Sequence, residues 1–514
     1  MAQEPKPYKT PDERITLDDL KKFLWAAATH LRGQIDAAGY KEYIFPLLFF
    51  KRISDVYDEQ YTGFVHEGGV EYANMQAEEF AIRIPDGAHW EDVRKVPEDI
   101  GSALVNAFIA IEQANPARNV DGRPVGGLEG IFGPKDGWKN KNKMPDHIIR
   151  SLIEDFSQHS LTLAACPADE MGQAYEYLVG KFADDAGNTA QEFYTNRTVV
   201  ELMAEILQPK PDESIYDPTC GSGGMLVKCL DFLRNKGENW QSVHVFGQEI
   251  NGLTSAIARM NLYLNGVEDF SIVRGDTLED PAFLDGSQLR KFDIVLANPP
   301  YSIKEWNRDA FANDKWGRNF LGTPPQRYAD FAFIQHIIKS LNPETGRCAI
   351  LLPQGILNRS GAENDIRLGL IETDLIECVI GIGKNLFYNS AMPACIIICR
   401  SSKPKDRRGK VIFIDASDYT ETTSDNITII SENHIKEIKD IYHQNLEVEG
   451  RSKIVPLEEI KSLGGSLMFS LFITAKESAI NINLDEAVQE WASNNSKAYK
   501  SIENLLSTIN KYES

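Results

Sequence analysis

The spacing of apolar residues divides the chain into a helical first part and a mixed second part. From about residue 17 to 59, apolar positions recur at helical spacing, which predicts a mainly helical first quarter. Residues 65–137 are richer in glycine, proline and mixed charge, and they predict loops and short elements around helices such as 100–113. A helix over 167–187 is expected to join this part to the next.

From about residue 191 to 415, short apolar runs alternate with helical patterns. This alternation is typical of an α/β fold, in which a twisted mixed or parallel sheet carries helices on both faces. In such a sheet, ligands bind beyond the carboxyl ends of the strands. We therefore expect the chemistry of the protein at the residues that follow the apolar runs.

Three of these strand ends predict a pocket for an adenosine-bearing ligand. A strand over 214–217 leads into the glycine-rich turn 217–224, and a helix follows, as in a dinucleotide-type fold. Glu249 ends a second strand, where its carboxylate can bind both hydroxyls of a ribose, and Asp276 follows a third, near an adenine amino group. Asp217 can bind the ammonium of a methionine or only cap the turn, and Asp276 can be a helix N-cap. Because no phosphate site accompanies them, these residues predict S-adenosylmethionine as the cofactor.

The tetrapeptide Asn298-Pro299-Pro300-Tyr301 follows a fourth apolar run, 292–297. An amine on a planar ring has its lone pair delocalised into the ring, so it must be held before it can attack a methyl group. The Asn298 amide oxygen and the Pro299 carbonyl can each accept one N–H of that amine, and Tyr301 offers a face for stacking. The motif predicts methyl transfer to adenine N6, although the same four residues are also ordinary turn chemistry.

These motifs and their order resemble those of amino-group DNA methyltransferases. The run Glu-Phe-Tyr-Thr at 192–195 narrows the resemblance to the modification subunits of type I restriction-modification enzymes, the HsdM family. Other similar segments lie at 24–33, 53–57, 171–178, 329–336, 352–355, 386–388 and 393–396. The resemblance therefore covers nearly the whole chain.

The resemblance implies two sets of site residues. The catalytic set is Asn298, Pro299, Pro300 and Tyr301. The cofactor-binding set is Glu192, Phe193, Tyr194, Thr195, Asn196, Arg197, Asp217, Gly221, Ser222, Gly223, Glu249 and Asp276. No metal is expected, because displacement at a sulfonium carbon needs neither a metal nor a covalent nucleophile. Cys220 is therefore not expected to act as a nucleophile, and His336 is expected to be a packed histidine.

The resemblance also implies an organisation and a set of partners. We expect an N-terminal helical domain at 1–165, a Rossmann-like adenine methyltransferase domain at 166–480, and a C-terminal helix for subunit assembly at 481–514. The family methylates double-stranded DNA, and a separate specificity subunit chooses the site. Two modification subunits are expected per specificity subunit, with a restriction subunit in the full complex.

Two segments depart from the family pattern. Asn196 stands where the family usually has a proline, which removes a fixed φ angle. The segment 465–473, Gly-Ser-Leu-Met-Phe-Ser-Leu-Phe-Ile, replaces a more polar, proline-bearing one. This second change puts the docking of the C-terminal region in doubt.

The C-terminal segment carries a heptad pattern that does not depend on the resemblance. Asn483 and Glu486 fit a capping box at its start. The apolar seam with a/d spacing comprises Leu484, Val488, Trp491, Asn495, Ala498, Ile502, Leu505, Ile509 and Tyr512. Such a helix can fold back on its own domain or pack between chains, and the polar Asn495 favours an interchain coil. The specificity subunit is the partner that the resemblance implies.

Charge and cysteine usage set outer limits on these predictions. The formal net charge of -21 argues against a chain that grips DNA by itself, since phosphates are neutralised by lysine and arginine. Two basic stretches, at 135–143 with Trp138 and at 400–410, are open to DNA contact or to an ordinary surface role. The seven cysteines show no metal-ligand spacing and are expected to be reduced core residues. The polar N-terminus and the lack of a long apolar stretch predict a cytoplasmic protein.

Three other functions stay open at this stage. An Asn-Pro-Pro-Tyr site also serves enzymes that methylate the amide nitrogen of glutamine in proteins, although these are usually shorter. The chain could instead be a catalytically idle scaffold of a defence complex. The third alternative is a DNA methyltransferase whose product is N4-methylcytosine, although serine often replaces the asparagine of the motif in those enzymes.

Overall fold

The computed structural model describes residues 14–29, 31, 39–120, 123–185, 195–384, 386, 392–423 and 428–474. The described residues up to Ile473 belong to one compact unit. The predicted C-terminal coil, together with Glu192, Phe193 and Tyr194, lies outside the described residues.

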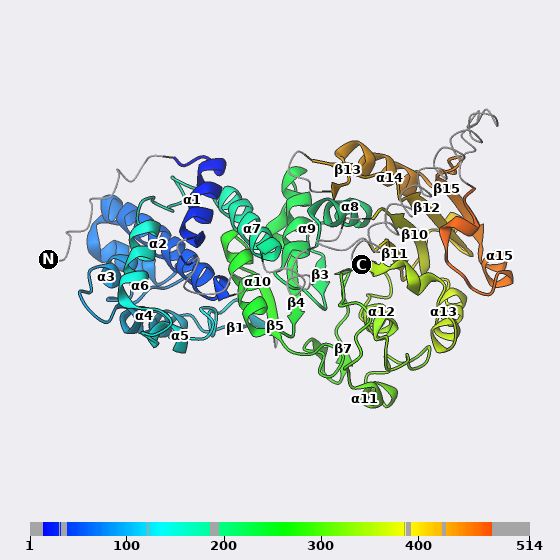
Figure 1. Ribbon diagram of the computed structural model, residues 1–514, viewed down its shortest axis with the longest axis horizontal. Helices are drawn as coiled ribbons and strands as arrows, with labels where there is room; N and C mark the ends of the chain where they lie inside the picture. The colour runs from blue at the N-terminus through cyan, green and yellow to red at the C-terminus, as the bar shows by residue number, and fades with distance from the viewer. Residues whose placement is uncertain are drawn as a thin grey trace, which may run out of the picture. The chain divides into compact units, whose positions relative to one another are not determined.

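The first part of the chain is helical, as the apolar spacing predicts (Figure 1). Its helices are α1 (Leu17–Thr29), α2 (Lys41–Ala77), α3 (Trp90–Arg94), α4 (Ile100–Ala114), α5 (Asp136–Lys139), α6 (Asp146–Phe156) and α7 (Ala168–Asp185). Phe45, Phe49 and Phe50 of α2 are fully buried in the core of this part, where Phe108 of α4 stacks on Phe132 with ring centroids 4.2 Å apart. Loops and short elements were expected from residue 65 on, but α2 extends to Ala77, with a break at Gly69, where φ is 82°.

The helical part joins the rest of the chain through a shared core. Ile257, Met260 and Leu264 of α10 (Gly252–Leu264) are buried in the same cluster as the residues of α2 and α7. The Tyr175 hydroxyl of α7 donates to the Ile257 carbonyl at 3.2 Å. A short antiparallel pair, β1 (Arg118–Val120) and β2 (Arg123–Val125), lies next to strand β5 (Phe270–Arg274), where Gly126 N–H donates to the Phe270 carbonyl.

A nine-stranded sheet forms the second part, in the order β15-β12-β10-β11-β9-β8-β3-β4-β5. The strands are β3 (Ser214–Asp217), β4 (His244–Glu249), β5, β8 (Ile294–Ala297), β9 (Arg347–Pro353), β10 (Ile376–Ile382), β11 (Ala394–Arg400), β12 (Lys410–Ala416) and β15 (Ser452–Pro456). Strands β5, β4, β3, β8 and β9 are parallel, whereas β11 and β15 run antiparallel to their neighbours. The predicted mixed α/β sheet is therefore confirmed.

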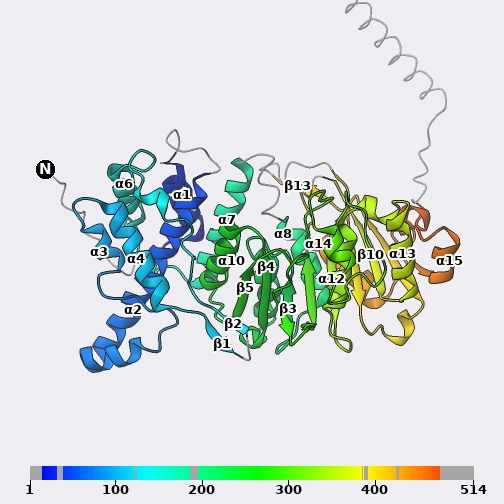
Figure 2. The same ribbon diagram turned by 90° about the horizontal axis from the view of Figure 1, so that it is seen from below.

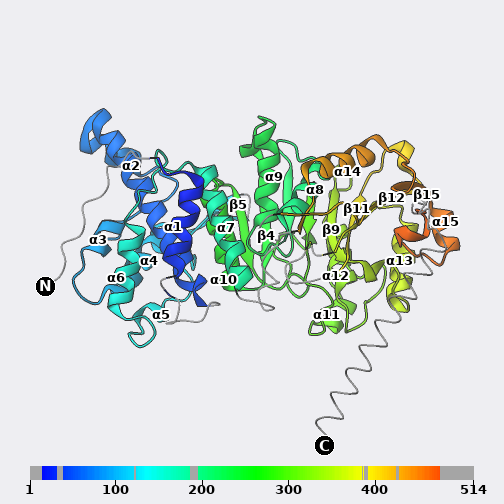
Figure 3. The ribbon, with the colours of Figure 1, turned by 45° about the horizontal axis from the view of Figure 1, so that its top comes forward.

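Helices cover both faces of this sheet (Figures 2 and 3). One face packs against α8 (Arg197–Leu207), α9 (Gly224–Asn235) and α14 (Glu432–Gln444), and Figure 3 shows α14 beside α8. The other face packs against α12 (Asp330–Lys339), α13 (Ala362–Glu372) and α15 (Leu457–Ser462). Ile294 and Leu296 of β8 belong to the first core and Val295 to the second, so alternate side chains serve opposite faces.

Shorter elements connect these layers. They are the strand pairs β6 (Leu284–Asp285) with β7 (Gln288–Leu289) and β13 (Glu421–Thr422) with β14 (Thr428–Ile429), the helix α11 (Arg308–Ala312), and the 3₁₀ turns η3 (Trp240–Ser242), η4 (Gln354–Leu357), η5 (Lys405–Arg407) and η6 (Phe469–Leu471). The unusual segment 465–473 is well packed, since Phe472 stacks on Phe413 of β12 at 4.4 Å and Leu467 N–H donates to the Leu357 carbonyl.

The structure corrects the DNA-contact role offered for Trp138. Its side chain is 1% exposed and packs edge-on against Tyr43 and Phe108, so it cannot stack on a base from this position. In the same stretch, Lys135 pairs with Glu112 at 2.9 Å and Lys141 with Asp99 at 3.2 Å.

The second basic stretch is also largely committed to internal contacts. Arg400 and Arg407 both bind the buried carboxylate of Glu377 at 3.0 Å. Lys403 is buried and pairs with Asp374 at 2.6 Å. These three cations hold elements of the fold together, which leaves the exposed Lys405, Arg408 and Lys410 as the basic side chains of this stretch that face solvent.

The predictions for the cysteines and for His336 are confirmed. All seven cysteines are free and buried. His336 is 1% exposed and its Nε2 lies 3.1 Å from the Tyr216 hydroxyl. Within the described part of the chain, helices of sufficient length and apolarity to cross a membrane are absent.

Candidate active site

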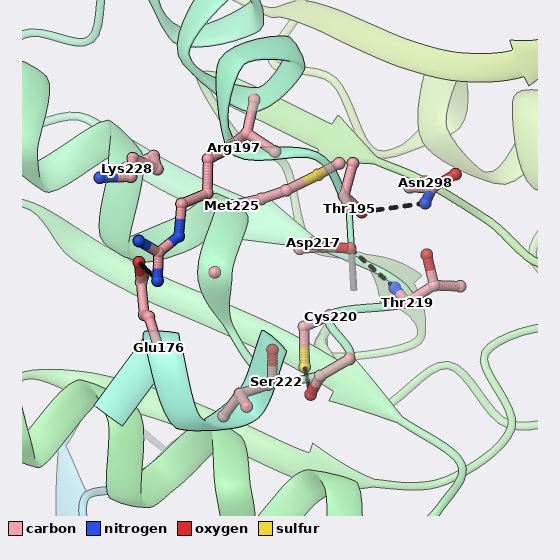
Figure 4. A pocket seen from close by; sticks show the side chains of 14 residues that line it. Glu176, Thr195, Arg197, Asp217, Thr219, Cys220, Ser222, Met225, Lys228 and Asn298 are labelled. Carbon is pink, nitrogen blue, oxygen red and sulfur yellow. Dashed lines mark hydrogen bonds and ion pairs between the residues drawn. The ribbon is translucent and has the colours of Figure 1, made fainter. Parts of the chain in front are cut away.

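One pocket gathers predicted residues from three separate segments of the chain (Figure 4). Thr195 and Arg197 come from the start of α8, Asp217 from the end of β3, and Asn298 from the end of β8. The full lining comprises Glu176, Val179, Thr195, Arg197, Val200, Asp217, Thr219, Cys220, Gly221, Ser222, Gly224, Met225, Lys228 and Asn298. The pocket lies beyond the carboxyl ends of adjacent parallel strands, where an α/β sheet places its ligands.

The glycine turn forms the floor of this pocket. Gly221 and Gly223 have φ angles of 54° and 78°, in the left-handed region that favours glycine. Gly223 is the residue before α9, and no side chain caps the N-terminus of this helix. The start of this uncapped helix therefore offers backbone N–H groups of its first turn, a favourable position for a carboxylate.

Asp217 is a buried acid at one side of the turn. Its Oδ1 accepts a hydrogen bond from the Thr219 N–H at 2.9 Å, so it caps the turn, and its side chain also lines the pocket. Burial, opposed by the Thr219 hydrogen bond and assisted by the charge of Glu249, raises the pKa of Asp217 to about 7. Near neutral pH the protonated and ionised forms of this carboxyl are therefore close in free energy, and a neighbouring cation would favour the ionised form.

Glu249 contacts the turn from the end of β4. Its Oε2 accepts from the Gly221 N–H at 3.0 Å and its Oε1 from the Asn251 N–H at 2.8 Å. Glu249 thus fixes the glycine turn from the strand end at which a ribose contact was expected.

Asp276 lies outside the group of residues that line the pocket. Its Oδ1 accepts from the N–H groups of Leu278 at 2.8 Å and Glu279 at 3.3 Å. This is the capping arrangement that the sequence left open for Asp276. Pro299, Pro300 and Tyr301 also lie outside that lining, although Tyr301 reaches it through Asn298.

The amide of Asn298 is held by hydrogen bonds on both sides. Its Nδ2 donates to Thr195 Oγ1 at 2.9 Å, and the Tyr301 hydroxyl donates to its Oδ1 at 2.7 Å. These two bonds orient the amide, with its nitrogen toward Thr195 and its oxygen toward Tyr301. Oδ1 keeps one further lone pair, so the oriented amide can accept an N–H from another molecule.

The loop after Tyr301 is anchored by charged side chains that sequence reasoning did not select as site residues. Ser302 has a φ angle of 52°, a strained value for a residue with a side chain. Its N–H donates to Asp330 Oδ1, and its hydroxyl accepts from Arg359. Arg359 also pairs with Asp330 and with Glu363, at 3.2 and 3.1 Å. Asp330 lies in one of the family-like segments, but its position in the sequence does not show what it contacts.

Asn196 serves as the cap of α8 in this structure. Its Oδ1 accepts from the Thr198 N–H at 3.0 Å, and its Nδ2 donates to the Thr428 carbonyl at 2.8 Å. Its φ angle of -54° is one that proline also adopts, which fits the proline of the family at this position. The side chain of Asn196 is therefore occupied by the fold.

Glu176 of α7 is a charged pocket residue that the predicted site set does not include. It is 8% exposed, and its Oε2 lies 3.3 Å from Arg197 Nη2. Burial, opposed by the charges of Arg197 and Lys228, raises the pKa of Glu176. The signal that could have found it is its place in the family-like segment 171–178, one helix before the Glu-Phe-Tyr-Thr run.

The donors and acceptors of the pocket fit S-adenosylmethionine better than a phosphate-bearing nucleotide. Two acids, Asp217 and Glu249, lie at the glycine turn and would repel a phosphate, whereas an ammonium and two hydroxyls suit them. Arg197 and the free N–H groups of α9 offer donors for one carboxylate. Clusters of His, Cys, Asp and Glu that could hold a metal ion are not found among the described residues.

Comparisons with known proteins place the chain in a family. The model of the family "N-6 DNA Methylase" matches residues 167–479, and that of the "HsdM N-terminal domain" matches residues 20–156. The MjaVII methylase subunit of a type I restriction enzyme from Methanocaldococcus jannaschii is 30% identical over 93% of this chain and 82% of its own length. The HindI methylase subunit from Haemophilus influenzae is 33% identical over 74% of this chain and 82% of its own length.

The fold agrees with these relatives. A crystal structure of a type I restriction-modification methyltransferase subunit from Streptococcus thermophilus superimposes with a TM-score of 0.74 and 29% identity, covering 88% of this chain and 98% of that one. A family match over more than half of the chain and relatives of this coverage lead to one conclusion: the chain belongs to the N-6 DNA methylase family, among the methylase subunits of type I restriction enzymes.

Proposed function

We propose that this chain is the modification subunit of a type I restriction-modification enzyme and transfers a methyl group from S-adenosylmethionine to N6 of a flipped adenine in DNA. The observation that carries the proposal is the Asn298 amide, held between Thr195 and Tyr301 at a pocket that also contains Asp217 and the glycine turn. An oriented amide oxygen next to a cofactor pocket can accept an N–H of an exocyclic amine, which makes the amine nitrogen a better nucleophile.

For the cofactor, we propose contacts from residues at three strand ends. Asp217 would accept from the methionine ammonium, Glu249 from the ribose hydroxyls, and the backbone of Gly221 to Gly223 would lie against the ligand. Thr195 and Arg197 would close the methionine end, with Glu192, Phe193, Tyr194 and Asn196 as neighbours in sequence. Asp276 would stand near the adenine, with its backbone as the contact, since its side chain caps the following turn. When bound, S-adenosylmethionine supplies an electrophilic methyl group on its sulfonium.

For the target base, Asn298 and its neighbours would divide three tasks. The free lone pair of Asn298 Oδ1 accepts one N–H of the adenine amine, and the Pro299 carbonyl accepts the other. Both bonds raise electron density on the nitrogen as the methyl arrives. The ring of Tyr301 supports the flipped base by stacking, and Pro300 stiffens the turn. Flipping costs a few kcal/mol, which stacking and DNA contacts must offset.

We further propose that the chain works within a larger assembly. The division into a helical domain at 1–165, a methyltransferase domain at 166–480 and an assembly helix at 481–514 fits this role. A net charge of -21 and basic side chains already paired with acids favour a partner that supplies much of the DNA affinity. That partner is a specificity subunit bound by two modification subunits, and a restriction subunit completes the enzyme in the cytoplasm.

A transfer assay with the purified complex tests this proposal. The chain, co-purified with its proposed specificity subunit, is incubated with labelled S-adenosylmethionine and double-stranded DNA that carries the site. The nucleosides are then separated. The proposal expects label in N6-methyladenine alone. Label in N4-methylcytosine, label in protein glutamine, or binding of the cofactor without any transfer would contradict it.

A further inference from the structure

Among the described residues, three side chains of the pocket carry buried polar atoms without a hydrogen-bond partner, namely Thr219, Arg197 and Glu176, and the last two face each other. Nε and Nη2 of Arg197 and Oε1 of Glu176 are buried without a hydrogen-bond partner among the described residues. The closest approach of the two side chains is 3.3 Å, an ion pair that lacks hydrogen-bond geometry (Figure 4). A buried guanidinium N–H without an acceptor costs free energy, so such an arrangement indicates that a ligand supplies the acceptor.

The other described cation of the pocket does not have this property. Lys228 donates to Asp231 one turn along α9 at 3.1 Å, so its charge is already paired. Arg197 therefore holds the unused donors on this side of the pocket. Its two free nitrogens, Nε and Nη2, are the pair that binds both oxygens of a carboxylate in a planar fork.

The two ends of a zwitterionic amino acid fit this division of charge. The charges of Arg197 and Lys228 oppose the burial that raises the pKa of Glu176. Neither charge is among the causes of the raised pKa of Asp217, which lies at the glycine turn. The cation of Arg197 and the acid of Asp217 thus act on different parts of the pocket. A carboxylate suits the first part and an ammonium suits the second.

With Arg197 at the methionine end of the cofactor, as proposed above, we infer that Glu176 is the positioning residue that holds the Arg197 guanidinium for the α-carboxylate. Glu176 acts through its charge and its place on α7, a helix that contributes none of the predicted site residues. The inference rests on the proposed function, because it takes S-adenosylmethionine as the ligand. The new element is Glu176, whose contact with Arg197 would determine how tightly the amino acid end of the cofactor is bound.

Two ligands that differ only at that end separate the possibilities. S-adenosylhomocysteine carries the amino acid, and 5′-methylthioadenosine carries the same adenosine and thioether without it. Their affinities are measured by equilibrium dialysis for the wild type, Glu176→Gln, Arg197→Met and the double variant. Glu205→Gln is the matched control. Glu205 lies on α8, the helix of Arg197, but outside the pocket lining, and it pairs with Lys439 of α14.

The inference makes four linked expectations for these variants. Arg197→Met weakens S-adenosylhomocysteine binding on the order of 30-fold and Glu176→Gln on the order of 10-fold, the range of charge-assisted hydrogen bonds. Neither change alters 5′-methylthioadenosine binding by more than about twofold. The double variant equals Arg197→Met, because Glu176 acts through Arg197. Glu205→Gln matches the wild type.

Other outcomes overturn the inference in distinguishable ways. Equal loss of both ligands by Glu176→Gln would mean that the residue only shapes the pocket. Unchanged binding of S-adenosylhomocysteine would mean that the ion pair is not used. Additive effects in the double variant would mean that Glu176 acts independently of Arg197. If the wild type binds neither ligand, the proposed function fails and the inference fails with it.

Discussion

At the scale of single residues, the orientation of the Asn298 amide depends on Tyr301 and Thr195. Because Tyr301 donates to the oxygen that would hold the target amine, its hydroxyl and its ring have separable tasks. Tyr301→Phe keeps the ring and loses one neutral hydrogen bond, so we expect kcat to fall about 5- to 10-fold. Tyr301→Ala also loses base stacking and should lower kcat/KM on the order of 100-fold. Steady-state methylation kinetics test both, and equal effects of the two variants would contradict this division.

The raised pKa of Asp217 gives cofactor binding a pH dependence. Burial raises its pKa to about 7, so the carboxyl loses its proton in the empty pocket only near neutral pH. A bound ammonium favours the ionised form, and affinity should therefore rise from pH 6 to pH 8, by about tenfold if the bound carboxyl stays ionised at pH 6. The stability of the unliganded protein depends on pH in the opposite direction. The contribution of Asp217 to stability is full below about pH 4 and is lost as the pH rises through about 7.

Titration of S-adenosylhomocysteine between pH 6 and pH 8 checks this expectation, with Asp217→Asn as the comparison. The variant should bind more weakly and without this pH dependence. A wild-type affinity that is constant over this range, or one that falls as the pH rises, would show that Asp217 does not face the ammonium.

At the scale of elements, the cap of α8 connects a departure from the family pattern to stability. Asn196→Ala loses the acceptor for the Thr198 N–H and the donor to the Thr428 carbonyl. We expect a loss of about 1 to 2 kcal/mol in the free energy of unfolding. Asn196→Asp keeps the cap and loses only the second contact, so it should cost less. Urea unfolding of the two variants tests the order, and equal losses would contradict a contribution of the cap, because both variants lack the Thr428 contact.

The strands and helices that carry the site could be predicted because their patterns are local. The runs before Asp217, Glu249 and Asn298 are strands, and the helix after the glycine turn begins at Gly224. The second half of α2 could not be predicted, since glycines at 68 and 69 usually end a helix, whereas here the helix resumes beyond them. The ion pairs of Arg359 with Asp330 and of Glu176 with Arg197 could not be predicted either, because the partners are distant in sequence.

At the scale of the whole molecule, buried charge joins elements that the sequence pattern treats as separate. Glu377 of β10 is 1% exposed and binds Arg400 of β11, Arg407 of η5 and the Tyr442 hydroxyl of α14. Burial alone would raise its pKa, but Arg400, the Tyr442 hydroxyl and Arg407 together lower it. What looked in the sequence like a basic surface for DNA is in part the support of this buried acid.

Removing Glu377 should therefore destabilise the protein strongly. Glu377→Ala leaves two arginines without their shared carboxylate, and we expect a loss of about 3 to 5 kcal/mol. Glu372→Ala, an exposed acid of α13, should change the free energy by less than about 0.5 kcal/mol. Thermal unfolding of both variants checks the difference, and similar melting temperatures would contradict the support role of Glu377.

The central claim is methyl transfer to adenine at Asn298, and one measurement tests it most directly. DNA is isolated from a host without adenine methylation that expresses this chain with its specificity subunit, either as the wild type or as Asn298→Ala. Its nucleosides are quantified by mass spectrometry. The account predicts N6-methyladenine in the first case and none in the second, while the purified variant still binds S-adenosylhomocysteine. N6-methyladenine that persists in the variant, or its absence from both with the complex assembled, would contradict the account.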